Sequence, residues 1–218
     1  MRTAREQYLT AMDIPVWILR DGDKSVGENR NLDSADWSAL ETQVRECKKC
    51  ELHSSRTQTV FGVGSENADL LIVGEAPGVE EDRRGEPFVG RAGQLLDAML
   101  QAISLSRNEV YIANILKCRP PNNRDPREAE SAACAFYLER QIALLEPKVI
   151  FALGRIAAQW LLQSDTPIGR LRGKQLSLGN PATPLVASYH PAYLLRSPAA
   201  KAKSWEDLRL VRQLLRQT

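Results

Sequence analysis

Several features are scarce or missing in this sequence of 218 residues, and each absence narrows what the chain can be. It has no run of about 18 or more apolar residues, and residues 1–10 lack the apolar centre of a signal peptide. We therefore expect neither a membrane span nor export, and place the protein in the cytoplasm. The net charge is only +2, so any contact with nucleic acid must come from a local basic patch.

Cysteine is also scarce, with four residues: Cys47, Cys50, Cys118 and Cys134. In a reducing compartment, a metal site explains them better than two disulfides. A structural zinc site usually has two closely spaced pairs, whereas this chain has only Cys-Lys-Lys-Cys at 47–50. The spacing therefore favours an iron–sulfur cluster, with zinc and unrelated buried thiols as the alternatives.

The chain is expected to contain three segments. Residues 1–20 are a short amphipathic peptide, residues 21–31 are polar and charged like a flexible linker, and residues 32–218 form one folded domain. The 43% hydrophobic content is sufficient for a single compact core in that domain.

The domain is predicted to be α/β, with a four-stranded parallel sheet flanked by helices. Its strands are apolar runs at 70–73, 110–115, 149–153 and 185–187. These runs are continuous rather than alternating, which indicates strands buried on both faces. Helical patterns lie between and after them, including a first helix from about Trp37, one at 127–145 and one at 199–216.

Three segments with chemical potential follow these strands, where ligands bind in open α/β sheets. They are Gly74-Glu75-Ala76-Pro77-Gly78, Asn114 with the loop after it, and His190-Pro191-Ala192. Further blocks are Cys-x-x-Cys-x-Leu with Arg56-Thr57, Val60-Phe61-Gly62-x-Gly64, Gly85-x-Pro87-Phe88-Val89-Gly90, and Cys118 with Arg119-Pro120-Pro121-Asn122-Asn123-Arg124. Taken in the order in which they occur along the chain, these blocks resemble those of the family four uracil-DNA glycosylases of bacteria and archaea.

That resemblance implies the fold of the uracil-DNA glycosylase superfamily, a 4Fe-4S cluster on the four cysteines, and hydrolysis of deoxyuridine in DNA to begin base excision repair. It assigns Phe88 to stacking on the extruded base and Asn114 to reading N3–H and O4 of uracil. Glu81 would block the C5 methyl group of thymine. Without the resemblance, Phe88 would be ordinary core, Asn114 a strand-end cap, and Glu81 a solvated charge.

The catalytic residues implied are His190 and Glu75. His190 would donate to the uracil O2 as negative charge develops there. Glu75 either orients water or shapes the loop, and the two interpretations remain open. Ala76 stands where the family one enzymes carry an Asp, so it can contribute only to the pocket wall.

Uracil-containing DNA is the expected partner of a monomeric enzyme. Basic residues expected around the pocket are Arg83, Arg84, Arg119, Arg124, Arg127, Arg196, Lys201 and Lys203. Tyr193 and Leu194 are candidates for filling the vacated base stack. The alternatives are a non-catalytic iron–sulfur DNA-binding module and the related class that cross-links to the abasic site, whose extra basic loop this chain lacks.

Residues 8–20 form a separate motif, Leu9-x-x-Met12-x-Ile14-x-x-Trp17-x-Leu19-Arg20. It looks like the peptide by which the psi subunit of the bacterial replicase docks on the clamp loader, except that Asp13 replaces an expected Gly. Its aromatic and basic anchors suit a tethered binding peptide, so the clamp loader is a candidate partner. The alternative is that the peptide packs on its own domain.

Overall fold

The computed structural model describes residues 37–179 and 182–217. The chain divides into two units, residues 1–35 and 36–218, and everything described here belongs to the second. The predicted N-terminal peptide, its proposed clamp-loader contact and the linker lie outside the described residues. Within the described part, no helix has the length and apolar character needed to span a bilayer.

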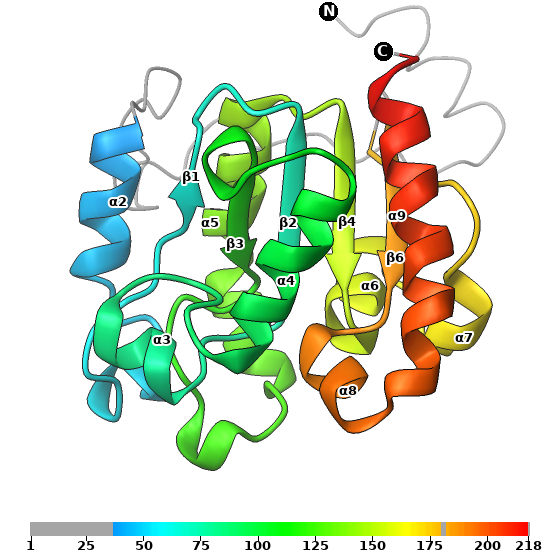
Figure 1. The fold of residues 1–218 in the computed structure, drawn as a ribbon. Coiled ribbons are helices and arrows are strands. Elements are labelled where there is room, and N and C mark those ends of the chain that lie inside the picture. Colours follow the sequence, from blue (N-terminus) through cyan, green and yellow to red (C-terminus); the bar gives the residue numbers. More distant parts are fainter. Residues whose placement is uncertain (1–36, 180–181, 218) are drawn as a thin grey trace, which may run out of the picture. The chain divides into compact units, whose positions relative to one another are not determined.

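The core of the domain is a mixed sheet of six strands in the order β1-β3-β2-β4-β6-β5 (Figure 1). The strands are β1 Val63–Gly64, β2 Leu70–Gly74, β3 Tyr111–Asn114, β4 Val149–Leu153, β5 Leu176–Leu178 and β6 Thr183–Ser188. The four predicted strands correspond to β2, β3, β4 and β6, which run parallel in the centre.

The prediction of four strands is wrong in number, because β1 and β5 add antiparallel edges to β3 and β6. Both edge strands are short and only partly buried. A strand of two or three residues without a continuous apolar run is too short to produce a recognisable hydrophobic pattern in the sequence.

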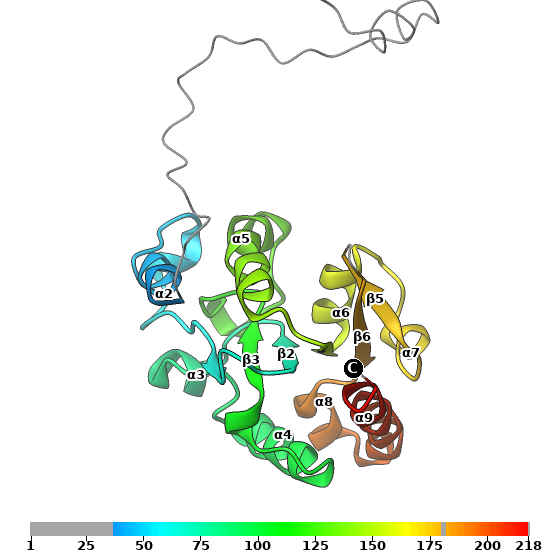
Figure 2. The same cartoon turned by 90° about the horizontal axis from the view of Figure 1, so that it is seen from above.

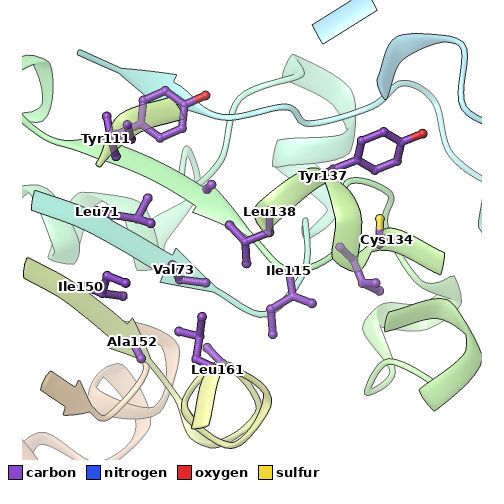
Figure 3. Close-up of a cluster of buried hydrophobic side chains, with 14 of the residues drawn as sticks. Leu71, Val73, Tyr111, Ile115, Cys134, Tyr137, Leu138, Ile150, Ala152 and Leu161 are labelled. Carbon is purple, nitrogen blue, oxygen red and sulfur yellow. The ribbon is translucent and has the colours of Figure 1, made fainter. Parts of the chain in front are cut away.

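Helices cover both faces of the sheet (Figure 2). They are α2 Trp37–Arg45, α3 Val79–Arg84, α4 Arg91–Ala102, α5 Glu128–Leu145, α6 Arg155–Leu162, α7 Ile168–Leu171, α8 Pro191–Arg196 and α9 Lys201–Leu215. Successive strand residues point to opposite faces. Leu71 and Ile150 therefore pack with α2, α5 and α6 in one cluster (Figure 3), while Ile72 and Phe151 pack with α4 and α9 in the other.

A buried ion-pair network joins the end of β6 to α9. Asp207 is fully buried, and its carboxylate accepts hydrogen bonds from Arg172 at 2.8 and 3.1 Å and from the Ser188 hydroxyl at 2.6 Å. Ser188 is the last residue of β6, and it also contacts the Ser204 hydroxyl at 3.0 Å. The network fixes the strand end from which the His190 loop departs.

Candidate active site

A pocket of ≈ 460 Å³ opens at the carboxyl ends of the parallel strands, near the point where the connections that follow β2 and β4 run to opposite sides of the sheet. It is lined by Glu75, Ala76, Gly78, Glu81, Phe88, Ala92, Asn114, Asn123, Asp125, His190, Ala192, Tyr193 and Arg196. The structure therefore brings all six predicted pocket residues together. Of the residues predicted to contact DNA, Arg196 and Tyr193 line the same space.

Phe88 is held in a backbone conformation that side-chain-bearing residues rarely adopt. Its φ is +54° and its side chain is buried. The first turn of α4 packs so closely that a Cβ at Gly93 would lie 1.7 Å from the Phe88 carbonyl oxygen. Such backbone strain costs about 1–3 kcal/mol and is common at functional sites. Glycine at position 93 permits the close packing that fixes the ring.

Asn114 ends β3, and its backbone pairs with Gly74 of β2. The residue is 2% exposed, and a Cβ at Gly74 would lie 2.3 Å from the Asn114 Oδ1 and 2.8 Å from the Phe88 ring. Among the described residues, no protein group forms a hydrogen bond with the Asn114 carboxamide. Its donor and its acceptor are therefore available to a molecule in the pocket.

His190 caps the N-terminus of α8, where its Nδ1 accepts a hydrogen bond from the Ala192 main-chain N–H at 3.1 Å. An accepting Nδ1 carries no proton, so the neutral ring carries its proton on Nε2. Burial, reinforced by Arg196 and opposed by Glu81, lowers the pKa of His190 to about 4. At neutral pH the imidazole is consequently an uncharged donor.

Glu75 directly follows β2 and lines the pocket. Burial first, and then the nearby Asp125, raise the pKa of Glu75 to about 7, while Arg155 opposes the rise. Asp125 and Arg155 form an ion pair at 2.8 Å. Sequence reasoning missed this pair, because Asp125 lies in a loop, Arg155 begins α6, and no motif includes both.

Glu81 is engaged by the main chain on both carboxylate oxygens. Oε1 accepts from the N–H groups of Val89 and Gly90 at 2.9 and 3.1 Å, and Oε2 accepts from Gly78 N–H at 3.1 Å. Its neighbour Asp82 is also buried and accepts from Thr57 N–H at 3.0 and 3.1 Å. Glu81 and Asp82 are therefore loop anchors, not solvated charges.

The four cysteines are free thiols in the described part of the chain, on the side of the sheet covered by α5. Cys47 and Cys50 follow α2 and are half-buried, whereas Cys118 and Cys134 are buried. The Sγ of Cys118 accepts from Arg56 Nη1 at 3.0 Å, and that of Cys134 from the Lys117 main-chain N–H at 3.4 Å.

Electrostatic interactions also link these thiols. Burial raises the pKa of Cys134 to about 11, and the hydrogen bond and charge of Lys117 oppose that rise. Burial likewise raises the pKa of Cys118, and the nearby Cys50 and Cys47 add to this rise. The described residues contain no group of three or more ligating side chains arranged for a single metal ion.

Lys117 is a buried lysine near the site, and sequence reasoning assigned it no role. It is 1% exposed, and its Nζ donates to main-chain and side-chain oxygens on three segments. Its position between a strand-end Asn and a predicted cysteine ligand was the only available signal, and the sequence does not reveal that the side chain turns inward.

Comparison with known proteins agrees with this fold and pocket. Residues 61–209 match the model of the uracil DNA glycosylase superfamily. The type-4 uracil-DNA glycosylase of Archaeoglobus fulgidus is 44% identical over 178 residues, covering 79% of this chain and 89% of that protein. The type-4 enzyme of Sulfurisphaera tokodaii is 41% identical, covering 80% and 83%, and that of Thermotoga maritima 43% identical, covering 71% and 81%. The chain belongs to the uracil-DNA glycosylase superfamily and, within it, to the type-4 family.

Proposed function

We propose that this protein hydrolyses the N-glycosidic bond of deoxyuridine in DNA and releases uracil. The observation that carries the proposal is the meeting of three groups in one pocket: an aromatic ring, a carboxamide to which no described residue forms a hydrogen bond, and a neutral imidazole donor. The type-4 relatives are named for this activity, and they are similar to the chain over most of their length.

Recognition of the base is assigned to Phe88 and Asn114. Uracil in a duplex must first be extruded, after which its face can stack on an aromatic ring for about 1–3 kcal/mol. Uracil presents a donor at N3 and an acceptor at O4, whereas cytosine presents an acceptor and a donor. The Asn114 carboxamide can pair with the first pattern by accepting and donating side by side. The burial of both residues keeps water from competing for these contacts.

Bond cleavage is assigned to His190 and Glu75. As the glycosidic bond breaks, negative charge gathers on the uracil O2, and a donor that is already oriented stabilises it most. The Nε2–H of His190 is such a donor, because Nδ1 is occupied by Ala192 N–H. The Glu75 carboxylate, which lines the same pocket, would orient the attacking water. Ala76 contributes only to the wall of the pocket.

The four cysteines are assigned to a 4Fe-4S cluster. One feature supports the assignment: N–H donors face the sulfurs of Cys118 and Cys134, as they do around metal-bound thiolates. When bound, the cluster would act as a structural tie between α2, the 118–126 loop and α5.

The test is a glycosylase assay on oligonucleotides that differ only in carrying uracil, cytosine or thymine at one position. We expect release of uracil alone, and Asn114→Asp should lower the rate sharply because a carboxylate cannot donate to O4. Tight DNA binding with no base release would instead indicate the non-catalytic module. Protein purified without oxygen should contain about four irons per chain, whereas stoichiometric zinc would exclude the cluster.

A further inference from the structure

The Lys117 side chain forms a buried junction between three segments of the domain. Its Nζ donates to the carbonyl oxygen of Asn114 at 2.9 Å, to that of Phe61 at 3.1 Å and to Gln141 Oε1 at 2.6 Å. These three bonds use all the protons of an ammonium group. The side chain is therefore fixed, and with it the main chain at Asn114.

The partners of Lys117 are themselves held in place. The Gln141 amide donates to the Phe61 carbonyl oxygen at 3.0 Å and to the Tyr111 hydroxyl at 3.2 Å. Gln141 is fully buried in α5, the helix that also carries Cys134. A shift of α5 would consequently be transmitted through Gln141 and Lys117 to the end of β3.

The charge of Lys117 needs compensation, since a buried ammonium is costly without a negative partner. All three of its acceptors are neutral, and within ranges 37–179 and 182–217 it forms no ion pair with a carboxylate. Burial lowers the pKa of Lys117 to about 7, and Cys134 and Cys118 oppose that fall. Its own main-chain N–H also donates to the Cys134 sulfur at 3.4 Å.

We propose that Lys117 is a positioning residue that couples the cysteine cluster to base recognition. Its main-chain N–H lies against the Cys134 sulfur, and its Nζ holds the Asn114 carbonyl, which sets the direction of the carboxamide in the pocket. The inference rests on the roles proposed for Asn114 and the four cysteines. It adds a physical connection between two sites that would otherwise be independent.

The first test is a double-mutant cycle with Lys117→Met, which keeps the length of the side chain and removes the ammonium. We expect about 10- to 100-fold slower uracil release in single turnover, with little change in KM, as when a supporting residue of a site is removed. In the Asn114→Ala background the same substitution should change the rate by less than about 3-fold, because its effect passes through Asn114. Lys148→Met, at an exposed lysine paired with Asp69, is the matched control and should keep the wild-type rate.

The second test measures iron content and the reduction potential of the cluster. Loss of a nearby positive charge should make the potential of Lys117→Met more negative than that of Lys148→Met at equal iron content. Lys117→Gln keeps an N–H donor for the Asn114 carbonyl, so it should recover part of the rate while sharing the shift in potential. If Lys117→Met does not fold, Lys117→Gln carries both tests.

Two results would overturn the coupling: additive effects of Lys117→Met and Asn114→Ala, or an unchanged potential in both Lys117 variants. A wild-type protein that releases no uracil would refute the proposed function, and one without iron would refute the cluster. An active, iron-containing wild type with an additive cycle would refute only the role of Lys117.

Discussion

The Phe88 ring stacks on the His190 imidazole, with ring centroids 5.4 Å apart and 27° between the planes. The two residues come from different ends of the domain sequence, one before α4 and the other after β6. The contact and the hydrogen bond from Ala192 N–H together fix the orientation of the imidazole. The ring proposed to stack on the base and the proposed catalytic donor therefore hold each other in place.

His190→Ala should slow uracil release by about 100-fold or more while leaving DNA binding largely intact, because a donor aimed at developing charge acts mainly in the transition state. Single-turnover rates and binding to a uracil-containing duplex would be compared in the same variant. Equal losses in rate and affinity would show that His190 serves binding instead.

The low pKa of His190 also predicts how stability depends on pH. The folded chain keeps this ring neutral down to about pH 4, whereas the ordinary pKa is 6.5. Between these values the unfolded chain takes up a proton that the folded chain does not, so stability falls as the pH drops through this window. Wild type should lose up to about 3 kcal/mol of unfolding free energy relative to His190→Gln across it. Urea unfolding at several pH values measures the difference, and parallel curves would contradict the prediction.

Glu75 should give uracil release an ascending pH limb. Its pKa is raised to about 7, so the carboxylate that orients water is formed only as the pH rises through that value. Asp125→Asn removes a negative neighbour and should shift the limb to lower pH, whereas Arg155→Ala should shift it upward. Glu75→Gln should be slow and lack the limb. Persistence of the limb in Glu75→Gln would assign it to another group.

The main features of the fold and pocket were predictable from local patterns. Continuous apolar runs located the four central strands, because a strand buried on both faces admits no polar alternation. Parallel strands end at the same edge of the sheet, so residues following different strands, such as Glu75, Asn114 and His190, were expected to meet there. The structure places all three in one pocket.

The remaining features depend on contacts between segments that local patterns do not record. The inward turn of Lys117 depends on the carbonyl of Phe61 and the amide of Gln141. The left-handed backbone of Phe88 depends on close packing against Gly93, for which a glycine inside a helical pattern was the only trace. The edge strands form through hydrogen bonds to β3 and β6. Their short, half-exposed sequences carry no hydrophobic pattern that would predict these bonds.

Substitution can separate two roles that we propose for Glu81. The resemblance of the chain to its family implies that Glu81 blocks the thymine methyl group, and Glu81 lines the pocket. Its carboxylate, however, accepts three main-chain hydrogen bonds that tie the start of α3 to the loop after Phe88. Hydrogen bonds to a charged group contribute about 1.5–3 kcal/mol, so these contacts should hold the loop firmly.

Glu81→Gln keeps the size of the side chain but replaces one accepting oxygen with an NH2 group, which then faces main-chain N–H. We expect uracil release to slow by about 10-fold or more as the Phe88 loop loosens, with thymine still refused. Glu81→Ala should slow uracil release as well and also allow some release of thymine, because it removes the side chain that would block the C5 methyl group. Glu80→Gln, at the neighbouring exposed residue paired with Arg83, is the control and should match wild type. Rates on matched uracil and thymine oligonucleotides decide each point separately: an unaffected Glu81→Gln would exclude the loop anchor, and absence of thymine release by Glu81→Ala would exclude the steric block.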